Sequence, residues 1–128
     1  MKSVSMIRCG IDMIEIVRVR EGIARFGERW LNRFFTADER AYCADQPHRL
    51  AARLAAKEAV AKALGTGIGD ISWREIEILG DARGRPTLTL HGAAADLAVS
   101  LGLTAWDVSL THTRESAAAM VVATMKKE

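Results

Sequence analysis

Glu58 and Lys62 are the two residues whose types and spacing point most directly to chemistry. They lie four positions apart in an alanine-rich stretch that favours a helix, so their side chains project from one flank about one turn apart. A carboxylate can hold a divalent cation and a neighbouring ammonium can bind a phosphate, as phosphoryl transfer requires. The alternative is a plain helix ion pair, which contributes about 0.2–0.5 kcal/mol. Ala51 and Ala55 continue this flank, and we expect them to leave room for a ligand.

The helix that carries this pair is predicted from Pro47 to Leu64. Proline suits the first position of a helix, and Gly65 and Gly67 provide a stop. We expect its buried stripe to comprise Leu50, Leu54, Ala61 and Leu64. The glycine-rich loop at 65–69 follows a helix, whereas phosphate-binding loops precede one, so a cap and turn is favoured over ligand contact.

A strand at the start of the chain is predicted to position a second carboxylate. Ile7, Cys9 and Ile11 alternate with polar or small residues, which is typical of a strand that delivers Asp12 at or near its end. That is a common place for a ligand-binding side chain. Asp12 is far from Glu58 in sequence, so the fold would have to bring the two together.

A basic helix is predicted from about Val17 to Phe34, with a break possible at Gly22 or Gly27 because glycine weakens helices. Its apolar face is expected to lie next to a face that carries Arg18, Arg25, Arg29 and Arg33. The arginines form either a docking surface for an acidic protein or an ordinary solvated face. Nucleic acid is disfavoured as a partner because the net charge is only +2 and no aromatic residues alternate with the arginines.

The remaining patterns indicate short helices and antiparallel strands, and hence an α+β fold. Thr36 and Glu39 form a capping box for a helix that ends at Cys43. Helical and strand patterns further along predict a hairpin of 75–79 and 87–90, a helix at 92–101, and strands at 106–111 and 117–124. His112 would then lie at a strand end.

Length and composition predict a single domain covering residues 1–128, since 49% of the residues are hydrophobic and only two are proline. The first residues are too few and too charged for a signal peptide, and no apolar run reaches the length of a membrane span. We therefore expect a cytoplasmic protein with no membrane partner. Cys9 and Cys43 lack a metal or disulfide motif, so both are interpreted as reduced packing residues.

Four motifs occur in a characteristic order along the chain: Gly10-Ile-Asp12, Ala56-Lys-Glu-Ala-x-x-Lys62-Ala-Leu-Gly-Thr-Gly67, Asp81-x-x-Gly-Arg-Pro86 and Val108-Ser-Leu-Thr-His-Thr113. Together, from about Ile7 to Val122, they resemble holo-acyl-carrier-protein synthase, the short class of 4′-phosphopantetheinyl transferases. The resemblance implies that family's α+β fold, an antiparallel sheet packed against a long central helix. It also implies transfer of the phosphopantetheine arm of coenzyme A to a serine of apo acyl carrier protein in fatty acid biosynthesis, with release of 3′,5′-ADP.

The resemblance also assigns roles to individual residues. It makes Asp12 and Glu58 the ligands of Mg²⁺, and it implies that Lys62 stabilises the leaving phosphate. The proton that the serine loses could pass to a metal-bound water or to Asp12. His112 is a third catalytic candidate for which we expect phosphate contact. The positions expected to contact coenzyme A are Lys57, Lys62, Gly65, Gly84, Pro86, His112 and Thr113. For Lys57 a snorkelling side chain is an equal alternative, and a turn alone would explain Gly84 and Pro86.

The resemblance further implies two kinds of protein contact. An acidic helix of the carrier protein would dock on the arginine face, at Arg18, Arg25 and Arg29. Active sites would form between the subunits of a homotrimer, with Asp12 and Glu58 supplied by different chains. Arg53 is expected on the far flank of the central helix, where it could reach a coenzyme phosphate only from a neighbouring subunit or through a fold in the chain. The rival functions are a non-catalytic carrier-binding module and a small metal-dependent phosphohydrolase.

Overall fold

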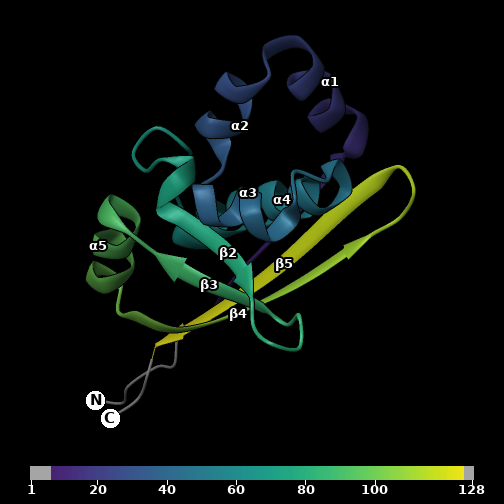
Figure 1. The fold of residues 1–128 in the computed structure, drawn as a ribbon. Helices are drawn as coiled ribbons and strands as arrows, with labels where there is room; N and C mark the ends of the chain where they lie inside the picture. Colours follow the sequence, from purple (N-terminus) through teal and green to yellow (C-terminus); the bar gives the residue numbers. More distant parts are fainter. Residues whose placement is uncertain (1–6, 126–128) are drawn as a thin grey trace, which may run out of the picture.

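The computed structural model describes residues 7–125, which form a three-stranded antiparallel sheet, a separate β-hairpin and a set of helices (Figure 1). In Figure 1 the α1–α2 pair lies above α3 and α4, and β4 and β5 pass below them. In chain order the elements are β1 (Ile7–Glu15), α1 (Ile16–Phe26), α2 (Glu28–Phe34), α3 (Ala37–Cys43), α4 (Pro47–Leu64), the 3₁₀-helix η1 (Trp73–Glu75), β2 (Ile76–Gly80), β3 (Pro86–Leu90), α5 (Gly92–Ser100), β4 (Leu103–His112) and β5 (Ser116–Met125).

Helix α4 packs on one face of the sheet, whose strand order is β1-β5-β4. Its contact with β1 is very close: a Cβ built at Gly10 would lie 1.9 Å from the carbonyl oxygen of Ala59. Only glycine allows this approach, and the small side chains of α4 are what fill the interface. The expectation that Ala51 and Ala55 leave room for a ligand is therefore wrong, because both are fully buried.

The basic helix predicted at 17–34 is broken into α1 and α2 at Gly27, which has a φ of 57° that favours glycine. Gly22 stays helical because the side chain of Trp30 packs directly against it; a Cβ at Gly22 would lie 2.2 Å from Trp30 Cε2. The two glycines thus have different roles, one as a hinge between helices and one as a packing site. The break leaves Phe26 55% exposed, although its predicted place was on the apolar face.

The face of the sheet opposite α4 carries exposed apolar side chains. Ile11 pairs with Met120 across β1 and β5, so the two side chains share this face. Ile7, Ile11 and Met13 are 65–70% exposed, and Met120 is 47% exposed. Cys9 also lies exposed on β1, so the prediction that it is a packing residue is wrong, whereas Cys43 is buried as expected. An apolar patch of this kind is typical of a protein–protein contact.

The other elements agree closely with the sequence. The predicted capping box of Thr36 and Glu39 is present at the start of α3, and α4 begins at Pro47 and ends at Leu64 as predicted. Gly65 caps α4 in the left-handed conformation at φ 76°, which confirms the cap-and-turn interpretation. Within residues 7–125, no helix combines the length and apolar character needed to cross a bilayer.

Candidate active site

Asp12, Glu58 and Lys62 meet at the interface of β1 and α4. Lys62 Nζ donates hydrogen bonds to Asp12 Oδ1 at 3.1 Å and to the carbonyl oxygen of Ile11 at 3.0 Å. Glu58 lies one turn before Lys62 and is close enough to Asp12 for each carboxyl group to shift the pKa of the other. The expectation that Asp12 and Glu58 come from different subunits is therefore wrong, because the fold brings them together within one chain.

The two carboxyl groups share an environment that favours a proton or a cation between them. Burial, a hydrogen bond with Asp12 and the charge of Asp12 raise the pKa of Glu58 to about 7. Burial alone would raise the pKa of Asp12, but hydrogen bonds with Glu58 and Lys62 outweigh it, and this pKa falls below its usual value. Near neutral pH the Glu58 carboxyl group therefore still takes up a proton, and a bound cation would compete with that proton.

The donor set fits a hard divalent cation that also binds phosphate. Asp12 Oδ2 is buried and has no hydrogen-bond partner among the described side chains and backbone. Carboxylate oxygens suit Mg²⁺, which commonly takes only one or two of them and completes its shell with water and substrate phosphates. Within residues 7–125, no group of three or more His, Cys, Asp or Glu side chains is placed to hold a metal ion.

A larger pocket, of about 820 Å³, opens between α4, the β2–β3 loop and the edge strand β4. Arg49 and Arg53 project from α4 and both approach the Tyr42 ring, with guanidinium carbons 5.2 and 5.1 Å from its centre. Arg85, on the β2–β3 loop, pairs with Asp107 on β4 at 3.0 Å. The pocket is lined by Tyr42, Arg49, Arg53, Gly84, Arg85, Pro86, Asp107, Val108, Ser109, Leu110, Met120 and Val122. Three guanidinium groups make it suitable for an anionic ligand such as a nucleotide.

Gly84 and Pro86 line this pocket, and their contact with coenzyme A, which the family resemblance implies, stays a prediction. Gly84 has a φ of 83°, so the loop needs glycine at this position for its turn. Arg53, expected on the far flank of α4, is mostly buried and contributes to the same pocket.

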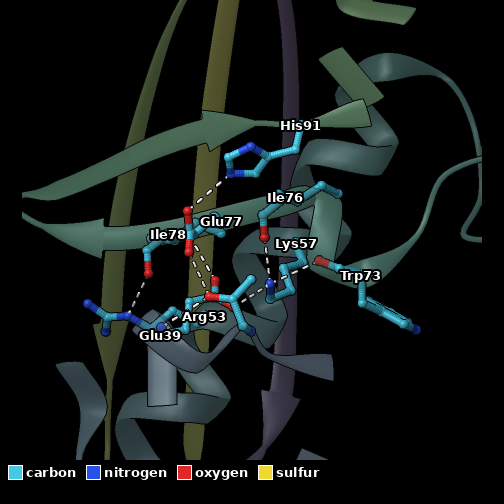
Figure 2. Close-up of polar contacts among 9 residues, drawn as sticks. Glu39, Arg53, Lys57, Trp73, Ile76, Glu77, Ile78 and His91 are labelled. Carbon is cyan, nitrogen blue, oxygen red and sulfur yellow. Dashed lines mark hydrogen bonds and ion pairs between the residues drawn. The ribbon is translucent and has the colours of Figure 1, made fainter. Parts of the chain in front are cut away.

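Lys57 lies outside both sites, and its predicted role as a coenzyme contact is not supported. Its side chain is fully buried, and its ammonium donates to Glu39 Oε1 at 2.8 Å, to Trp73 O at 3.0 Å and to Ile76 O (Figure 2). These three bonds use all of its hydrogens. Burial lowers the pKa of Lys57, and the Glu39 carboxylate opposes that shift. The snorkelling alternative is also wrong, because the charge is paired internally.

The other predicted contacts lie at the two ends of α4. His112 packs against His48, at the start of the helix, with ring centres 5.1 Å apart and the rings tilted by 48°, whereas Glu58 and Lys62 lie in the second half of α4. Thr113 uses its hydroxyl to close the β4–β5 turn, accepting from Ser116 N at 3.1 Å. Within one chain, therefore, His112 and Thr113 are not part of the Asp12–Glu58–Lys62 cluster, whereas Gly65 lies at the same end of α4 as Lys62.

One arginine of α1, Arg18, approaches the carboxylate pair. Arg18, Arg25 and Arg29 are all exposed, and the positive charge of Arg18 acts on Glu58 to lower its pKa. Beside Glu58 is a small pocket of about 120 Å³ lined by Ile14, Arg18, Trp30, Phe34, Leu54, Glu58 and Trp73. Arg18 thus places one positive charge of the basic surface beside the acidic site.

Comparisons with known proteins define the class. The family model of the 4′-phosphopantetheinyl transferase superfamily matches residues 8–121, and the chain belongs to this family. Curated relatives named holo-[acyl-carrier-protein] synthase include those of Herpetosiphon aurantiacus, 46% identical, and Solidesulfovibrio magneticus, 51% identical; each match covers 91% of this chain and 98% of the relative.

Solved structures agree. The holo-[acyl-carrier-protein] synthase of Helicobacter pylori in complex with coenzyme A has a TM-score of 0.83 at 31% identity, over 90% of this chain and 98% of the other. The enzyme of Neisseria meningitidis has a TM-score of 0.84 at 33% identity, over 95% and 100%. These findings confirm the α+β fold and the activity predicted from the sequence, 4′-phosphopantetheine transfer from coenzyme A to an acyl carrier protein.

Several residues of the arginine-lined pocket were missed from the sequence. Arg49 lies one helical turn before Arg53, and that spacing is a signal that could have identified the pair. Tyr42, Arg85 and Asp107 come from three other segments and carry no shared pattern. Only the folded chain brings them together.

Proposed function

We propose that Asp12, Glu58 and Lys62 form the catalytic site of this transferase, with Asp12 and Glu58 as the protein ligands of Mg²⁺. The observation that carries the proposal is the contact between Lys62 and Asp12 beside Glu58, with one buried carboxylate oxygen left without a donor. When bound, Mg²⁺ would neutralise negative charge on the pyrophosphate of coenzyme A.

In the proposed reaction the serine oxygen of the carrier protein attacks the phosphorus that bears the pantetheine arm. A serine–phosphorus bond forms, the bond from this phosphorus to the bridging oxygen breaks, and 3′,5′-ADP leaves. Lys62 is placed to neutralise the charge that develops on the leaving phosphate. Of the residues considered as acceptors of the serine's proton, Asp12 lies in this site, whereas His112 lies at the other end of α4.

The arginine-lined pocket is the candidate site for the nucleotide half of coenzyme A. Arg49, Arg53 and Arg85 offer bidentate donors for its phosphates, and Pro86 offers an apolar surface for its base. Along α4, Arg53 and Lys62 are separated by nine residues, or about 14 Å. One molecule therefore reaches both sites more readily if a neighbouring chain supplies one of them.

We accordingly propose a homotrimer in which the nucleotide pocket of one subunit faces the Asp12–Glu58–Lys62 cluster of the next. The exposed apolar face of β1 and β5 supports this assembly, since Ile11 and Met13 would be removed from water by it. Met120 and Val122 extend from that face into the pocket lining, so the proposed contact and the pocket are adjacent. In such an assembly His112 could contact phosphates bound by the next subunit.

The exposed arginines Arg18, Arg25 and Arg29 are the proposed docking surface for the acidic carrier protein. All three lie on α1 and α2, and Arg18 lies next to Glu58, so a carrier docked on them would have its serine near the carboxylate pair. We also propose that the enzyme acts in the cytoplasm; both cysteines, Cys9 and Cys43, are free thiols, as a reducing compartment would keep them.

Mass spectrometry of an apo carrier protein incubated with enzyme, coenzyme A and Mg²⁺ tests the catalytic assignment. The wild-type enzyme should add the phosphopantetheine mass, and Glu58→Gln should abolish the addition while its circular dichroism stays unchanged. Asp96→Asn, an exposed acidic position on α5, is the matched control and should keep full activity. Transfer by Glu58→Gln at a rate near that of the wild type would remove Glu58 from the site.

A further inference from the structure

On the edge of β2 that faces away from β3, side chains form the hydrogen bonds that a neighbouring strand would otherwise form with the β2 backbone. The carbonyl oxygen of Glu75 accepts a hydrogen bond from His91 N, so the peptide groups of Glu75 point toward β3. Because this direction alternates along an antiparallel strand, the N–H and C=O groups of Ile76 and Ile78 point away from β3. Lys57 donates to Ile76 O, Glu39 Oε2 accepts from Ile78 N at 2.8 Å, and Arg53 Nε donates to Ile78 O at 3.3 Å (Figure 2). Three charged side chains thus satisfy an otherwise unpaired strand edge.

Two of these side chains, Glu39 and Lys57, are fully buried and pair with each other at 2.8 Å. A buried ion pair costs desolvation free energy, and apolar side chains often replace one without loss of stability. Apolar side chains could not, however, bond the peptide groups of Ile76 and Ile78. The charges therefore have a specific effect here, which is to fix the position of β2 relative to α3 and α4.

The hairpin and α4 form opposite walls of the arginine-lined pocket. The loop between β2 and β3 contributes Gly84, Arg85 and Pro86, and α4 contributes Arg49 and Arg53. Lys57 and Arg53 therefore link α4 to β2 directly, and Glu39 on α3 adds a link to β2 and an ion pair to Lys57. Lys57 directly precedes Glu58 in α4, so the residue that holds the hairpin is adjacent in sequence to the proposed catalytic carboxylate.

We propose that Glu39 and Lys57 are positioning residues for coenzyme A. They hold the β2–β3 hairpin against α4 and so set the separation between the Gly84–Pro86 loop and the arginines of α4. Neither side chain contacts the ligand, because both are sealed inside the protein. The inference rests on the assignment of the pocket to the nucleotide half of coenzyme A.

The test is the double variant Glu39→Gln/Lys57→Met, which removes both charges and leaves neither buried alone. We expect the KM for coenzyme A to rise roughly tenfold while kcat changes by less than about threefold, because binding geometry is lost and the catalytic cluster is kept. The Kd for 3′,5′-ADP, measured by calorimetry, should rise by a similar factor. A folded double variant with wild-type KM and Kd would overturn the proposal.

A matched control separates positioning from general stabilisation. Arg40, next to Glu39 on α3, pairs with Glu28 and Asp45 at 2.8 Å each and touches neither β2 nor the pocket. Arg40→Met should lower the melting temperature and leave the KM for coenzyme A unchanged. A KM that rises equally in Arg40→Met would show that any loss of stability has this effect, and would also overturn the proposal.

Two further variants keep the outcome decisive. If the double variant does not fold, Glu39→Gln alone decides, because its amide oxygen can still accept from Lys57. A raised KM for coenzyme A with unchanged kcat supports the positioning role, and a wild-type KM refutes it.

The variant Arg49→Ala/Arg85→Ala tests the pocket assignment separately. If it binds coenzyme A as the wild type does, the pocket does not bind the nucleotide, and the fault lies in the pocket assignment rather than in the positioning role of Glu39 and Lys57.

Discussion

Gly10 on β1 lies so close to Ala59 on α4 that a single added methyl group would sit 1.9 Å from the Ala59 carbonyl oxygen. This contact fixes the distance between the strand that carries Asp12 and the helix that carries Glu58 and Lys62. The hydrogen bond from Lys62 to Asp12 depends on that distance.

Gly10→Ala should therefore push β1 away from α4 and separate the catalytic groups. Overpacking at a tight contact costs typically about 1–3 kcal/mol of stability, and we expect a loss of transfer rate beyond what that destabilisation explains. The measurements are thermal unfolding and the transfer rate at a temperature where the variant is folded. Gly67→Ala is the control, since a Cβ there meets nothing within 4 Å. Wild-type activity in Gly10→Ala would contradict the account of this interface.

Metal-free protein should lose stability as the pH rises from 4.5 to about 7. Burial and Asp12 raise the pKa of Glu58 from 4.5 to about 7, so in this window the folded state holds a proton that the unfolded chain has released. The stabilising effect is complete below pH 4.5 and is gone above about pH 7. Melting temperatures measured in EDTA across this range should fall more steeply for the wild type than for Glu58→Gln, and parallel curves would contradict the shifted pKa.

Subunit mixing tests whether active sites form between chains. Glu58→Gln keeps the nucleotide pocket, and Arg49→Ala/Arg85→Ala keeps the catalytic cluster, so each protein alone should be inactive. Co-expressed at equal levels, they should regain up to about a quarter of wild-type activity, because that share of cyclic interfaces joins an intact cluster to an intact pocket. If verified mixed trimers recover no transfer activity, the nucleotide pocket and the catalytic cluster of one active site belong to the same chain.

Charge reversal on the basic surface should weaken carrier binding. Arg25→Glu/Arg29→Glu removes two exposed positive charges, so the KM for the carrier protein should rise and its dependence on salt should become shallower. The KM for coenzyme A, determined at saturating carrier concentration, serves as the internal control and should not change. A carrier KM that responds to salt as in the wild type would favour an ordinary solvated face.

The parts of the fold that were predicted well depend on local signals. Pro47 and Gly65 set the ends of α4, and the Thr36–Glu39 capping box started α3. In contrast, whether a glycine breaks a helix depends on its tertiary contacts. Gly22 stays helical under the ring of Trp30, and nothing near it in sequence predicts that contact.

The same distinction applies to the sites. Glu58 and Lys62 are one turn apart, so their shared flank could be predicted from spacing, and the first-strand pattern and the family resemblance added Asp12, to which Lys62 is bonded. Lys57 was misassigned because its partner, Glu39, lies eighteen positions away and looked fully explained as a helix cap.

The account depends most on a shared cation at Asp12 and Glu58. Titration of Mn²⁺, as a spectroscopic substitute for Mg²⁺, into the enzyme in the presence of 3′,5′-ADP measures this directly by electron paramagnetic resonance. Asp12→Asn and Glu58→Gln should each weaken Mn²⁺ binding by at least about tenfold, since each removes one of two protein ligands. Either variant binding Mn²⁺ with wild-type affinity would contradict the central claim.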